Sequence, residues 1–389
     1  MDLYSLLNFE TVHWIILATL MLFFIIQLLF YFLLYRKPYI YELKREKNSL
    51  SDQDLPPISI IIASKNESEY LAENLPKILE QDYPDYEVIV VNSGSTDETD
   101  MVLKRLELDH KNLYHTYLPN NAESINEKKL ALTLGIKAAK NDLLIFTESY
   151  CAPCSNQWIR EYANAFAGGK DIVLGYCKFN IKKSVPMRRF VLYDNLIHCL
   201  KYLSLAIKHK PFMGIGRNMG YKRDLFFENK GFSSILNIEG GEDDLFINTV
   251  ANKTNTTVIT SPDSMTESSL INRFSTWREL KSKYMHTKQF YKGFQSGLFN
   301  WESFTKYGFY IAAICAIALG ITDKNNILIA STAFLFMFRW ITQSVILNKY
   351  NKLFKSGKYF FSLLYLDFFQ PINNLRFKRY ARRRGKILK

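Results

Sequence analysis

The stretch that decides the fold runs from residue 58 to residue 147, where ISIIIA (58–63), YEVIVV (86–91) and LLIFT (143–147) stand between longer stretches of helical spacing. Each short run is apolar and rich in β-branched residues, as buried strands are. A further run, Leu113 to Leu118, completes four strands that alternate with three helices. This order predicts an α/β domain with a parallel sheet wrapped by helices. Ligands of such sheets bind beyond the carboxyl ends of the strands.

The connecting helices have boundary signals of their own. Helical spacing covers 68–81, and Pro76 predicts a break inside that helix. Ser95-Thr96-Asp97-Glu98 has the pattern of a capping box and predicts a helix that continues to about residue 108. A second box at 124–127 predicts a helix that ends near residue 140.

An apolar run before this domain is long enough to span a membrane. Val12 to Tyr35 contains only Gln27 as a strongly polar residue, and it lacks the small-residue cleavage site of a signal peptide. We therefore expect an uncleaved anchor. Basic residues follow it from Arg36 onward, whereas Asp2 and Glu10 precede it, so the positive-inside rule predicts that everything after residue 36 is cytoplasmic.

Two more apolar segments follow the domain. They cover 307–321 and 327–347, and the short turn between them predicts a hairpin that returns the chain to the cytoplasm. The first segment is short and the second contains Arg339, which is costly in hydrocarbon unless it snorkels or pairs, so a partly interfacial pair of helices is the alternative. Residues 359–371 are too few to span and predict an amphipathic helix in the membrane plane.

Charge points to an anionic partner. The 389 residues carry a formal net charge of +13, and the chain ends in a basic tail, 376–389, directly after an aromatic segment. This arrangement favours anionic membrane lipid, with a merely solvated tail as the alternative. No nucleic-acid-binding motif is present, so we expect no nucleic acid partner. The five cysteines are an odd number and predict a reducing compartment, with the CxxC of Cys151 and Cys154 attributed to chance spacing.

The expected strand ends carry polar loops: 64–67, Asn92-Ser93-Gly94-Ser95 and Glu148-Ser149-Tyr150. Lys128 and Lys129 stand in the first turns of a helix, against its dipole, where a diphosphate would favour them and two solvated lysines are the alternative. Further on, Gly240-Gly241-Glu242-Asp243-Asp244 packs three carboxylates at a helix start. Three adjacent carboxylates exceed what a cap requires, and their crowding would raise at least one pKa toward that of a general base.

These motifs in this order resemble a membrane-bound family 2 glycosyltransferase of bacteria. The resemblance rests on 58–67, VVNSGSTDET, KKLALTLGIKAAKNDLLIFTES, CAPCSNQW, GIGRNMGY and GGEDDLF, and it spans about residues 56–290. It implies a GT-A fold, a nucleotide-sugar donor and inverting transfer to a hydroxyl by direct displacement.

The resemblance also implies roles for single residues. Asn66, Glu67, Asn92 and Ser93 would surround the nucleoside of the donor, Lys128 and Lys129 would lie near its diphosphate, and Glu148 would hold a Mg²⁺ or Mn²⁺ ion. Asp243 would be the general base, with Glu242, Asp244 and Asn218 on the acceptor side.

Three departures from the family pattern stand out. Asn92 and Ser93 replace the aspartates usual before Gly-Ser, and Glu148-Ser149-Tyr150 replaces Asp-x-Asp, which leaves one carboxylate for a metal. The Gln and Arg of the family's Gln-x-x-Arg-Trp pattern are absent near Ser282 and Met285. A catalytically degenerate binding or scaffold subunit with the same fold is therefore the alternative to an enzyme.

The sequence thus predicts a multi-pass cytoplasmic membrane protein of a bacterium. We divide it into an anchor (1–36), a linker (37–56), a GT-A domain (57–295), a transmembrane hairpin (304–347) and an interfacial helix with a basic tail (348–389). The predicted activity is transfer of a sugar to a lipid-linked or membrane-proximal saccharide acceptor in envelope polysaccharide or glycolipid assembly.

Overall fold

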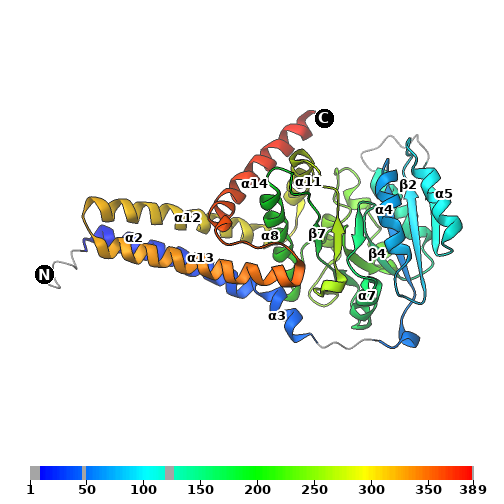
Figure 1. The fold of residues 1–389 in the computed structure, drawn as a ribbon, viewed down its shortest axis with the longest axis horizontal. Helices are drawn as coiled ribbons and strands as arrows, with labels where there is room; N and C mark the ends of the chain where they lie inside the picture. The colour runs from blue at the N-terminus through cyan, green and yellow to red at the C-terminus, as the bar shows by residue number, and fades with distance from the viewer. Residues whose placement is uncertain (1–8, 46–49, 119–126, 388–389) are drawn as a thin grey trace.

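The computed structural model describes residues 9–45, 50–118 and 127–387. It consists of an α/β domain and a long helical arm that extends from one side of it (Figure 1). The predicted box at 124–127 begins outside the described residues.

A mixed sheet forms the centre of the domain. Its strand order is β3 (Leu113–Tyr117), β2 (Tyr86–Asn92), β1 (Ile58–Ser64), β4 (Leu143–Phe146), β8 (Met219–Lys222), β6 (Ile172–Leu174) and β9 (Thr256–Val258). The first four strands are parallel, as predicted. The complete sheet is mixed, because β8, which lies beyond the stretch used for that prediction, runs antiparallel to both β4 and β6. A small second sheet is built from β5 (Cys151–Pro153), β10 (Thr266–Ser268) and β7 (Cys177–Phe179).

Helices cover both faces of the main sheet because side chains alternate along each strand. Ile60 and Ile62 share one core with residues of α4 (Ser68–Leu79), α5 (Thr99–Asp109) and α7 (Trp158–Ala167). Ile61 and Ala63 belong to the opposite core with residues of α6 (Glu127–Ala138), α8 (Arg188–Ile207) and α10 (Asp244–Val250). The short α9 (Arg223–Glu228) follows β8, and α11 (Phe274–Thr287) precedes the arm.

Two predicted helix boundaries were wrong. Helix α4 continues through Pro76 to Leu79, because a proline so near the end of a helix removes only one hydrogen bond and the last turn closes from Glu80 N–H to the Pro76 carbonyl. Helix α5 begins at Thr99. The residue at its N-cap position, Glu98, makes no capping hydrogen bond with its side chain. The Ser95 hydroxyl accepts the Asn66 N–H from a neighbouring loop instead of capping the helix.

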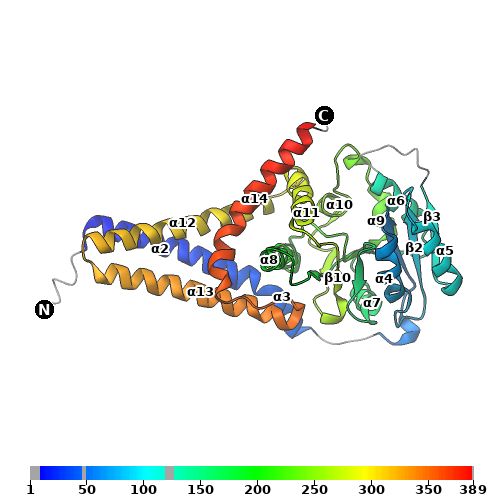
Figure 2. The same ribbon diagram turned by 45° about the horizontal axis from the view of Figure 1, so that its top comes forward.

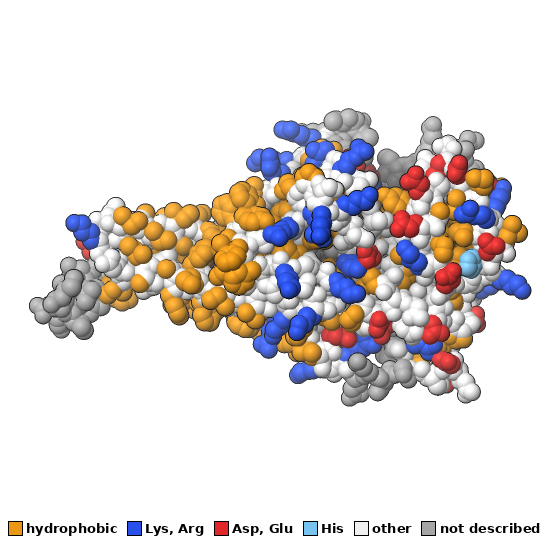
Figure 3. Space-filling model, in the orientation of Figure 1, with side chains coloured by type: hydrophobic (Ala, Val, Ile, Leu, Met, Phe, Trp, Pro, Cys, Tyr) orange, Lys and Arg blue, Asp and Glu red, His pale blue; other side chains and the backbone are white. Residues whose placement is uncertain are grey.

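The arm contains α2 (Thr11–Phe30), which continues through a π-helical turn (Tyr31–Tyr35) into α3 (Lys37–Lys44), together with α12 (Gln295–Thr322) and α13 (Asn326–Phe354). The first helix runs toward the domain, α12 runs away from it and α13 returns (Figures 1 and 2). Apolar side chains cover the arm, and lysine and arginine side chains gather where it meets the domain (Figure 3).

Four described helices are long and apolar enough to cross a membrane: Thr11–Lys44, Arg188–Ile207, Gly297–Thr322 and Asn326–Phe354. The second of these is α8, whose apolar window is 78% buried inside the protein, so it is a core helix of the domain. The expectation of a short first hairpin helix was wrong, since α12 has 28 residues. Its polar first half was missed because Glu302 and Lys306, which break the apolar pattern, are buried and paired with each other at 3.2 Å.

The last helix, α14 (Ser362–Ile387), continues past Pro371, where the sequence predicted an end. Asp367 on this helix is fully buried and accepts from Arg339 at 2.7 Å and from Lys306 at 2.9 Å. The predicted need for a partner of Arg339 is thereby met inside the protein. Helix α14 packs along α11 as well as α13, so it joins the arm to the domain.

Candidate active site

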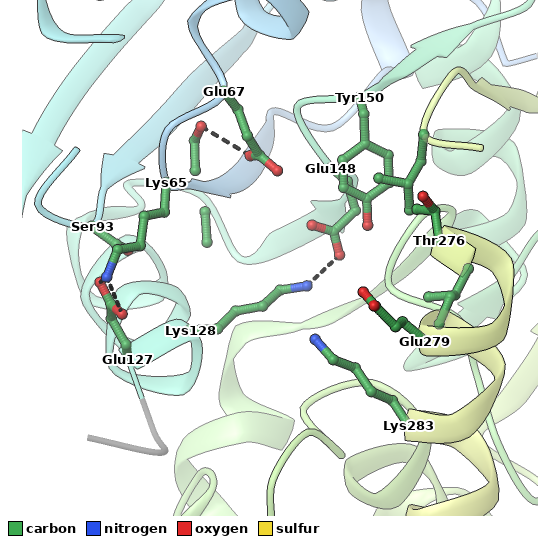
Figure 4. Close-up of a pocket in the computed structure, with 14 residues that line it drawn as sticks. Lys65, Glu67, Ser93, Glu127, Lys128, Glu148, Tyr150, Thr276, Glu279 and Lys283 are labelled. Carbon is green, nitrogen blue, oxygen red and sulfur yellow. Dashed lines mark hydrogen bonds and ion pairs between the residues drawn. The ribbon is translucent and has the colours of Figure 1, made fainter. Parts of the chain in front are cut away.

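A cleft borders the carboxyl ends of β1, β2 and β4, as the parallel strand order predicts. A first cavity of about 330 Å³ is lined by residues of the three strand-end loops and by α6 and α11. A second cavity of about 1030 Å³ leads from there to residues 237–244. Both are lined by Lys128, Glu148 and Tyr150, so together they form one cleft, hereafter the main cleft (Figure 4).

Two asparagine side chains accept hydrogen bonds from backbone N–H groups, one within the second loop and one between the first and second loops. Asn92 Oδ1 accepts the Ser95 N–H at 3.0 Å, and Asn66 Oδ1 accepts the Thr96 N–H at 2.7 Å. Asn66 has a φ of 56°, a left-handed conformation that asparagine tolerates better than most residues. The two asparagines therefore shape the loops, while Ser93 and Glu67 line the cavity itself. Their roles toward a nucleoside stay predictions.

Glu67 connects the first loop to the third. Its Oε2 accepts the Ser64 hydroxyl at 3.1 Å and also the Ser149 hydroxyl. The carboxylate thus occupies the junction of β1 and β4, where it fixes the direction of the 148–150 loop.

Lys128 crosses the main cleft. Its ammonium lies 2.5 Å from Glu148 Oε1 (Figure 4) and 3.2 Å from Glu242 Oε1. Burial alone would lower the pKa of Lys128, but the two carboxylates raise it well above its usual value, so the side chain is a cation. Burial raises the pKa of Glu148 although Lys128 opposes this. Burial also acts to raise the pKa of Glu242, but Lys128, a backbone hydrogen bond and Lys129 together outweigh it and lower that pKa.

Lys129 points elsewhere, although the sequence placed both lysines at a diphosphate. Its ammonium is buried and donates to the carbonyls of Ile235, at 2.8 Å, and Ile238. Successive residues of a helix point about 100° apart, so one neighbour faces the main cleft and the other faces the loop before residue 240. This contact set gives Lys129 a role in holding that loop, and a donor contact for it stays a prediction.

Asp243 lies at the inner end of the main cleft, at the start of α10. Its Oδ2 accepts the Gly216 N–H at 2.9 Å and the Tyr284 hydroxyl at 3.0 Å. A Cβ added at residue 216 would lie 3.4 Å from both Asp243 Cβ and Glu148 Oε1, so the backbone here approaches both carboxylate side chains to van der Waals distance. Burial, followed by the charge of Glu242, raises the pKa of Asp243.

Asp244 is buried and held by a different set of groups. Its Oδ2 accepts the Tyr291 hydroxyl at 2.6 Å and the Thr287 hydroxyl. Burial and the adjacent Asp243 charge raise the pKa of Asp244 to about 8. Asp244 therefore anchors α10 to α11 and to the segment that follows α11.

Asn218 does not reach the main cleft. Its Oδ1 accepts from Trp158 Nε1 at 3.0 Å and from the Tyr162 hydroxyl at 2.8 Å, while its amide donates to two backbone carbonyls. Every polar group of the side chain is thus used inside the core. The acceptor-side placement of Asn218 was wrong, and the neighbouring residue, Arg217, lines the main cleft in its place.

Sequence reasoning missed three residues of the main cleft. Arg217 is buried, stacks 4.9 Å from the centroid of the Phe179 ring, and has no hydrogen-bond partner for Nε among the described residues. Tyr284 and Lys283 come from α11, and Lys283 points into the cleft opposite Lys128 (Figure 4). The sequence did offer one indication of the two α11 residues, because α11 covers the region in which the resemblance expects Gln and Arg.

The residues offer little to a metal ion. Across the described ranges, no group of three or more His, Cys, Asp or Glu side chains could hold one. Glu148 supplies one carboxylate, and the Lys128 ammonium already occupies it at 2.5 Å. A divalent ion at Glu148 would have to displace this ammonium, so the residues present fit a metal poorly.

Comparisons with known proteins show what part of this chain is similar to. Residues 59–228 match the model of glycosyl transferase family 2. The glycosyltransferase AglE of Haloferax volcanii is 30% identical over 128 residues, which are 32% of this chain and 40% of that protein. A dolichyl N-acetyl-alpha-D-glucosaminyl phosphate 3-beta-D-2,3-diacetamido-2,3-dideoxy-beta-D-glucuronosyltransferase of Methanococcus voltae is 35% identical over 105 residues, 25% of this chain and 30% of that one.

One solved structure shares the fold over most of the chain. The mannosyltransferase PcManGT of Pyrobaculum calidifontis, in complex with GDP-Man and Mn²⁺, superposes with a TM-score of 0.54 and 17% identity over 82% of this chain and 96% of that one. The predicted GT-A-type α/β fold is thereby confirmed. The chain spans less than half the length of the two sequence relatives that it matches.

Proposed function

We propose that the protein is a membrane-bound inverting glycosyltransferase that moves a sugar from a nucleotide-sugar to a lipid-linked or membrane-proximal acceptor, because residues 59–228 match the model of glycosyl transferase family 2. The observation that carries the proposal is the main cleft, which begins at the loops of β1 and β2 and ends at the half-buried carboxylate of Asp243. A donor bound along it would have its nucleoside at one end and its sugar near a base at the other.

The outer part of the main cleft suits the donor. Glu67 and Ser93 would contact the nucleoside, with Asn66 and Asn92 shaping the loops around it. Lys128, Lys283 and Arg217 bring three cations to the main cleft, and cations stabilise the charge that develops on a departing diphosphate. Arg217 suits this task because its guanidinium is buried and has no carboxylate within ion-pair distance among the described residues.

The inner part suits the chemical step. Asp243 would remove the proton of an acceptor hydroxyl as that oxygen bonds to the anomeric carbon and the bond from that carbon to the diphosphate breaks. A raised pKa brings a carboxylate closer to the range in which it is an effective base near neutral pH. Tyr284 and the Gly216 N–H hold Oδ2, and the Asp244 N–H donates to Oδ1 at 2.7 Å, so the carboxylate is fixed at the inner end of the main cleft, where a remaining lone pair would take the proton.

A divalent metal, when bound, would add positive charge beside the diphosphate, with Glu148 as its protein ligand. Because Lys128 already contacts this carboxylate, we propose that the three cations carry most of the charge neutralisation.

The arm supports a membrane location. Apolar side chains cover it, and basic residues stand at its junction with the domain (Figure 3), which is the arrangement expected of a cytoplasmic-membrane protein of a bacterium with its catalytic domain in the cytoplasm. Anionic lipid headgroups would bind the basic residues at this junction. An acceptor in envelope polysaccharide or glycolipid assembly would then reach the main cleft from the membrane surface.

The test is a screen of nucleotide-sugars with detergent-solubilised full-length protein, with and without Mg²⁺ or Mn²⁺. We expect release of nucleotide from one donor and transfer of its sugar to a lipid-linked saccharide. Nucleotide binding without turnover on any donor would favour the alternative, a degenerate scaffold subunit, which the single carboxylate at 148–150 would explain.

A further inference from the structure

A separate cavity of about 510 Å³ lies where the arm meets the domain, between α8, α11, α12 and α14. Its lining includes four lysines, Lys201, Lys281, Lys288 and Lys378, and no aspartate or glutamate among the described residues. We call it the junction cavity. Such a concentration of like charges is unfavourable unless anions compensate it.

Only half of these charges are compensated by the described residues. Lys201 pairs with Glu302 at 3.2 Å, and Lys281 pairs with Asp194 at 2.9 Å. Lys288 contacts only the neutral Asn300 Oδ1, at 3.3 Å, and Lys378 has no carboxylate within ion-pair distance in the described part of the chain. The junction cavity therefore has an excess of positive charge.

Two further observations point to a missing anion. Burial, followed by the charges of Lys201 and its lysine neighbours, lowers the pKa of Lys288 to about 8. His198 lines the same cavity, and its buried Nε2 has no hydrogen-bond partner in the described structure. An oxyanion in the junction cavity would stabilise the lysines and could accept from the histidine.

The other wall of the junction cavity is apolar and faces the surface of the arm. Phe299 and Phe304 of α12 and Leu375 of α14 line it. Phe304 and Leu375 are also 57% and 58% exposed. Apolar surface of the arm reaches basic side chains at this level (Figure 3), so an alkyl chain could leave the junction cavity toward lipid while a charged head stays among the lysines.

The junction cavity adjoins the main cleft. Tyr284 and Gln289 line both, and the Tyr284 hydroxyl donates to Asp243 at 3.0 Å. Tyr291 lines the junction cavity too, while its hydroxyl donates to Asp244. A molecule anchored at the lysines would therefore place its next group close to the proposed base.

We propose that the junction cavity binds the phosphate or diphosphate head of a lipid-linked acceptor, with its hydrocarbon chain leaving between α12 and α14 and its sugar extending to Asp243. This inference rests on the proposed function and narrows its acceptor to a lipid phosphate ester that carries a saccharide. Lys288 and Lys378 would contact the phosphate oxygens, and α12 and α14 would bind the start of the chain.

The experiment measures binding of farnesyl diphosphate to the full-length protein in a neutral detergent, with inorganic pyrophosphate, farnesol and the phospholipid phosphatidylglycerol as comparison probes. We expect farnesyl diphosphate to bind at least about tenfold more tightly than each of the other three, because only it combines a dense charge with an isoprenoid chain. Equal binding of pyrophosphate would indicate a site for free phosphate. Equal binding of phosphatidylglycerol would indicate a general anionic-lipid site. Either result would overturn the inference.

The variant Lys288→Gln with Lys378→Gln should weaken farnesyl diphosphate binding at least about tenfold, since two charge-assisted hydrogen bonds are lost. The matched control, Lys352→Gln with Lys358→Gln, removes the same charge from exposed lysines outside the junction cavity and should bind as the parent does. Equal affinity of the two double variants for farnesyl diphosphate would reject the junction cavity as its binding site. A thermal-shift measurement with UDP and GDP distinguishes failure of this inference from failure of the proposed function. Nucleotide binding without farnesyl diphosphate binding would contradict only this inference. Absence of turnover on every donor would contradict the proposed function.

Discussion

At the scale of single residues, the chemistry converges on the pair Asp243 and Asp244. The two are adjacent in sequence, yet Asp243 opens to the main cleft while Asp244 is enclosed by Thr287 and Tyr291. The same burial that raises both pKa values thus acts on a candidate base in one case and on an anchoring group in the other.

Replacement of Asp243 by asparagine tests the base. Asp243→Asn keeps size and can still cap α10, but it removes the proton acceptor, so turnover should fall by roughly 10²- to 10⁴-fold while nucleotide binding is retained. The measurement is turnover at saturating donor, with Asp224→Asn, an exposed aspartate of α9, as the control. Turnover close to that of the parent would reject Asp243 as the base.

Asp244 should make stability depend on pH. Its folded pKa of about 8 lies above the usual value for aspartate, so the folded state binds a proton that the unfolded state has already lost, and stability falls as pH rises from about 4 to about 8. Asp243 and Glu148, whose pKa values are also raised, act with the same sign. Thermal unfolding in detergent at pH 5 and pH 9 should show a smaller drop in Tm for Asp244→Asn than for the parent. Equal drops would contradict the assignment.

Arg217 tests the balance of charge in the main cleft. Arg217→Gln removes a buried cation, so we expect turnover to fall at least tenfold and nucleotide-diphosphate affinity to weaken, because the developing charge on the leaving group loses a stabilising partner. The control is Arg223→Gln, whose guanidinium lies 5.7 Å from the Phe227 ring centroid on α9. If the kinetics of Arg217→Gln equal those of the parent and a chelator abolishes the activity of both, a metal rather than Arg217 neutralises the charge of the leaving diphosphate.

At the scale of elements, the buried ion pairs at the base of the arm connect separate helices. Asp367 of α14 contacts Lys306 of α12 and Arg339 of α13, and Gln27 of α2 accepts from the same arginine at 3.2 Å. The N-terminal helix α2 and the three consecutive helices α12, α13 and α14 thus meet at one charged cluster. Removing one member leaves charges buried without a counter-ion, which costs more than the intact pairs contribute.

Asp367→Asn should therefore destabilise the protein by roughly 3–5 kcal/mol, the range found when one partner of a buried ion pair is removed. The measurement is thermal unfolding in detergent. Asp323→Asn at the opposite end of the arm is the control, because its ion pair with His13 is partly exposed and should contribute little. Similar Tm values for the two variants would mean that water or lipid solvates the cluster.

The elements also mark how far sequence reasoning reaches. Strands β1, β2 and β4 were predictable because their apolar runs, which are β-branched above all in β1 and β2, report burial directly. The capping box at Ser95 was misread because that hydroxyl serves a neighbouring loop, a tertiary contact that no local pattern encodes. Asn218 and Lys129 are adjacent in sequence to Arg217 and Lys128, which line the main cleft, but their own side chains make contacts inside the protein. The lysines of the junction cavity come from α8, α11, the turn after it and α14, so only folding brings them together.

At the scale of the whole molecule, the proposed membrane location of the arm assigns each end of the protein to one side of the membrane. The start of α2 and the turn between α12 and α13 lie together at the far end, where His13 contacts Asp323 at 2.8 Å (Figure 1). The domain and α14 lie at the other end, beside the basic residues that follow the first span. Three spans arranged in this way place the domain and α14 on one side.

This topology can be tested by thiol labelling in intact cells of a bacterial host. In a Cys315→Ala background, which removes the exposed cysteine of the arm, Thr322→Cys should react with a membrane-impermeant maleimide without permeabilisation. Lys352→Cys, exposed near the domain end of α13, should react only after the cytoplasmic membrane is opened. The expectation follows from the basic residues after α2, which the positive-inside rule retains in the cytoplasm. The reverse pattern would place the main cleft outside the cell, away from cytoplasmic nucleotide-sugars, and would overturn the proposed function together with the topology.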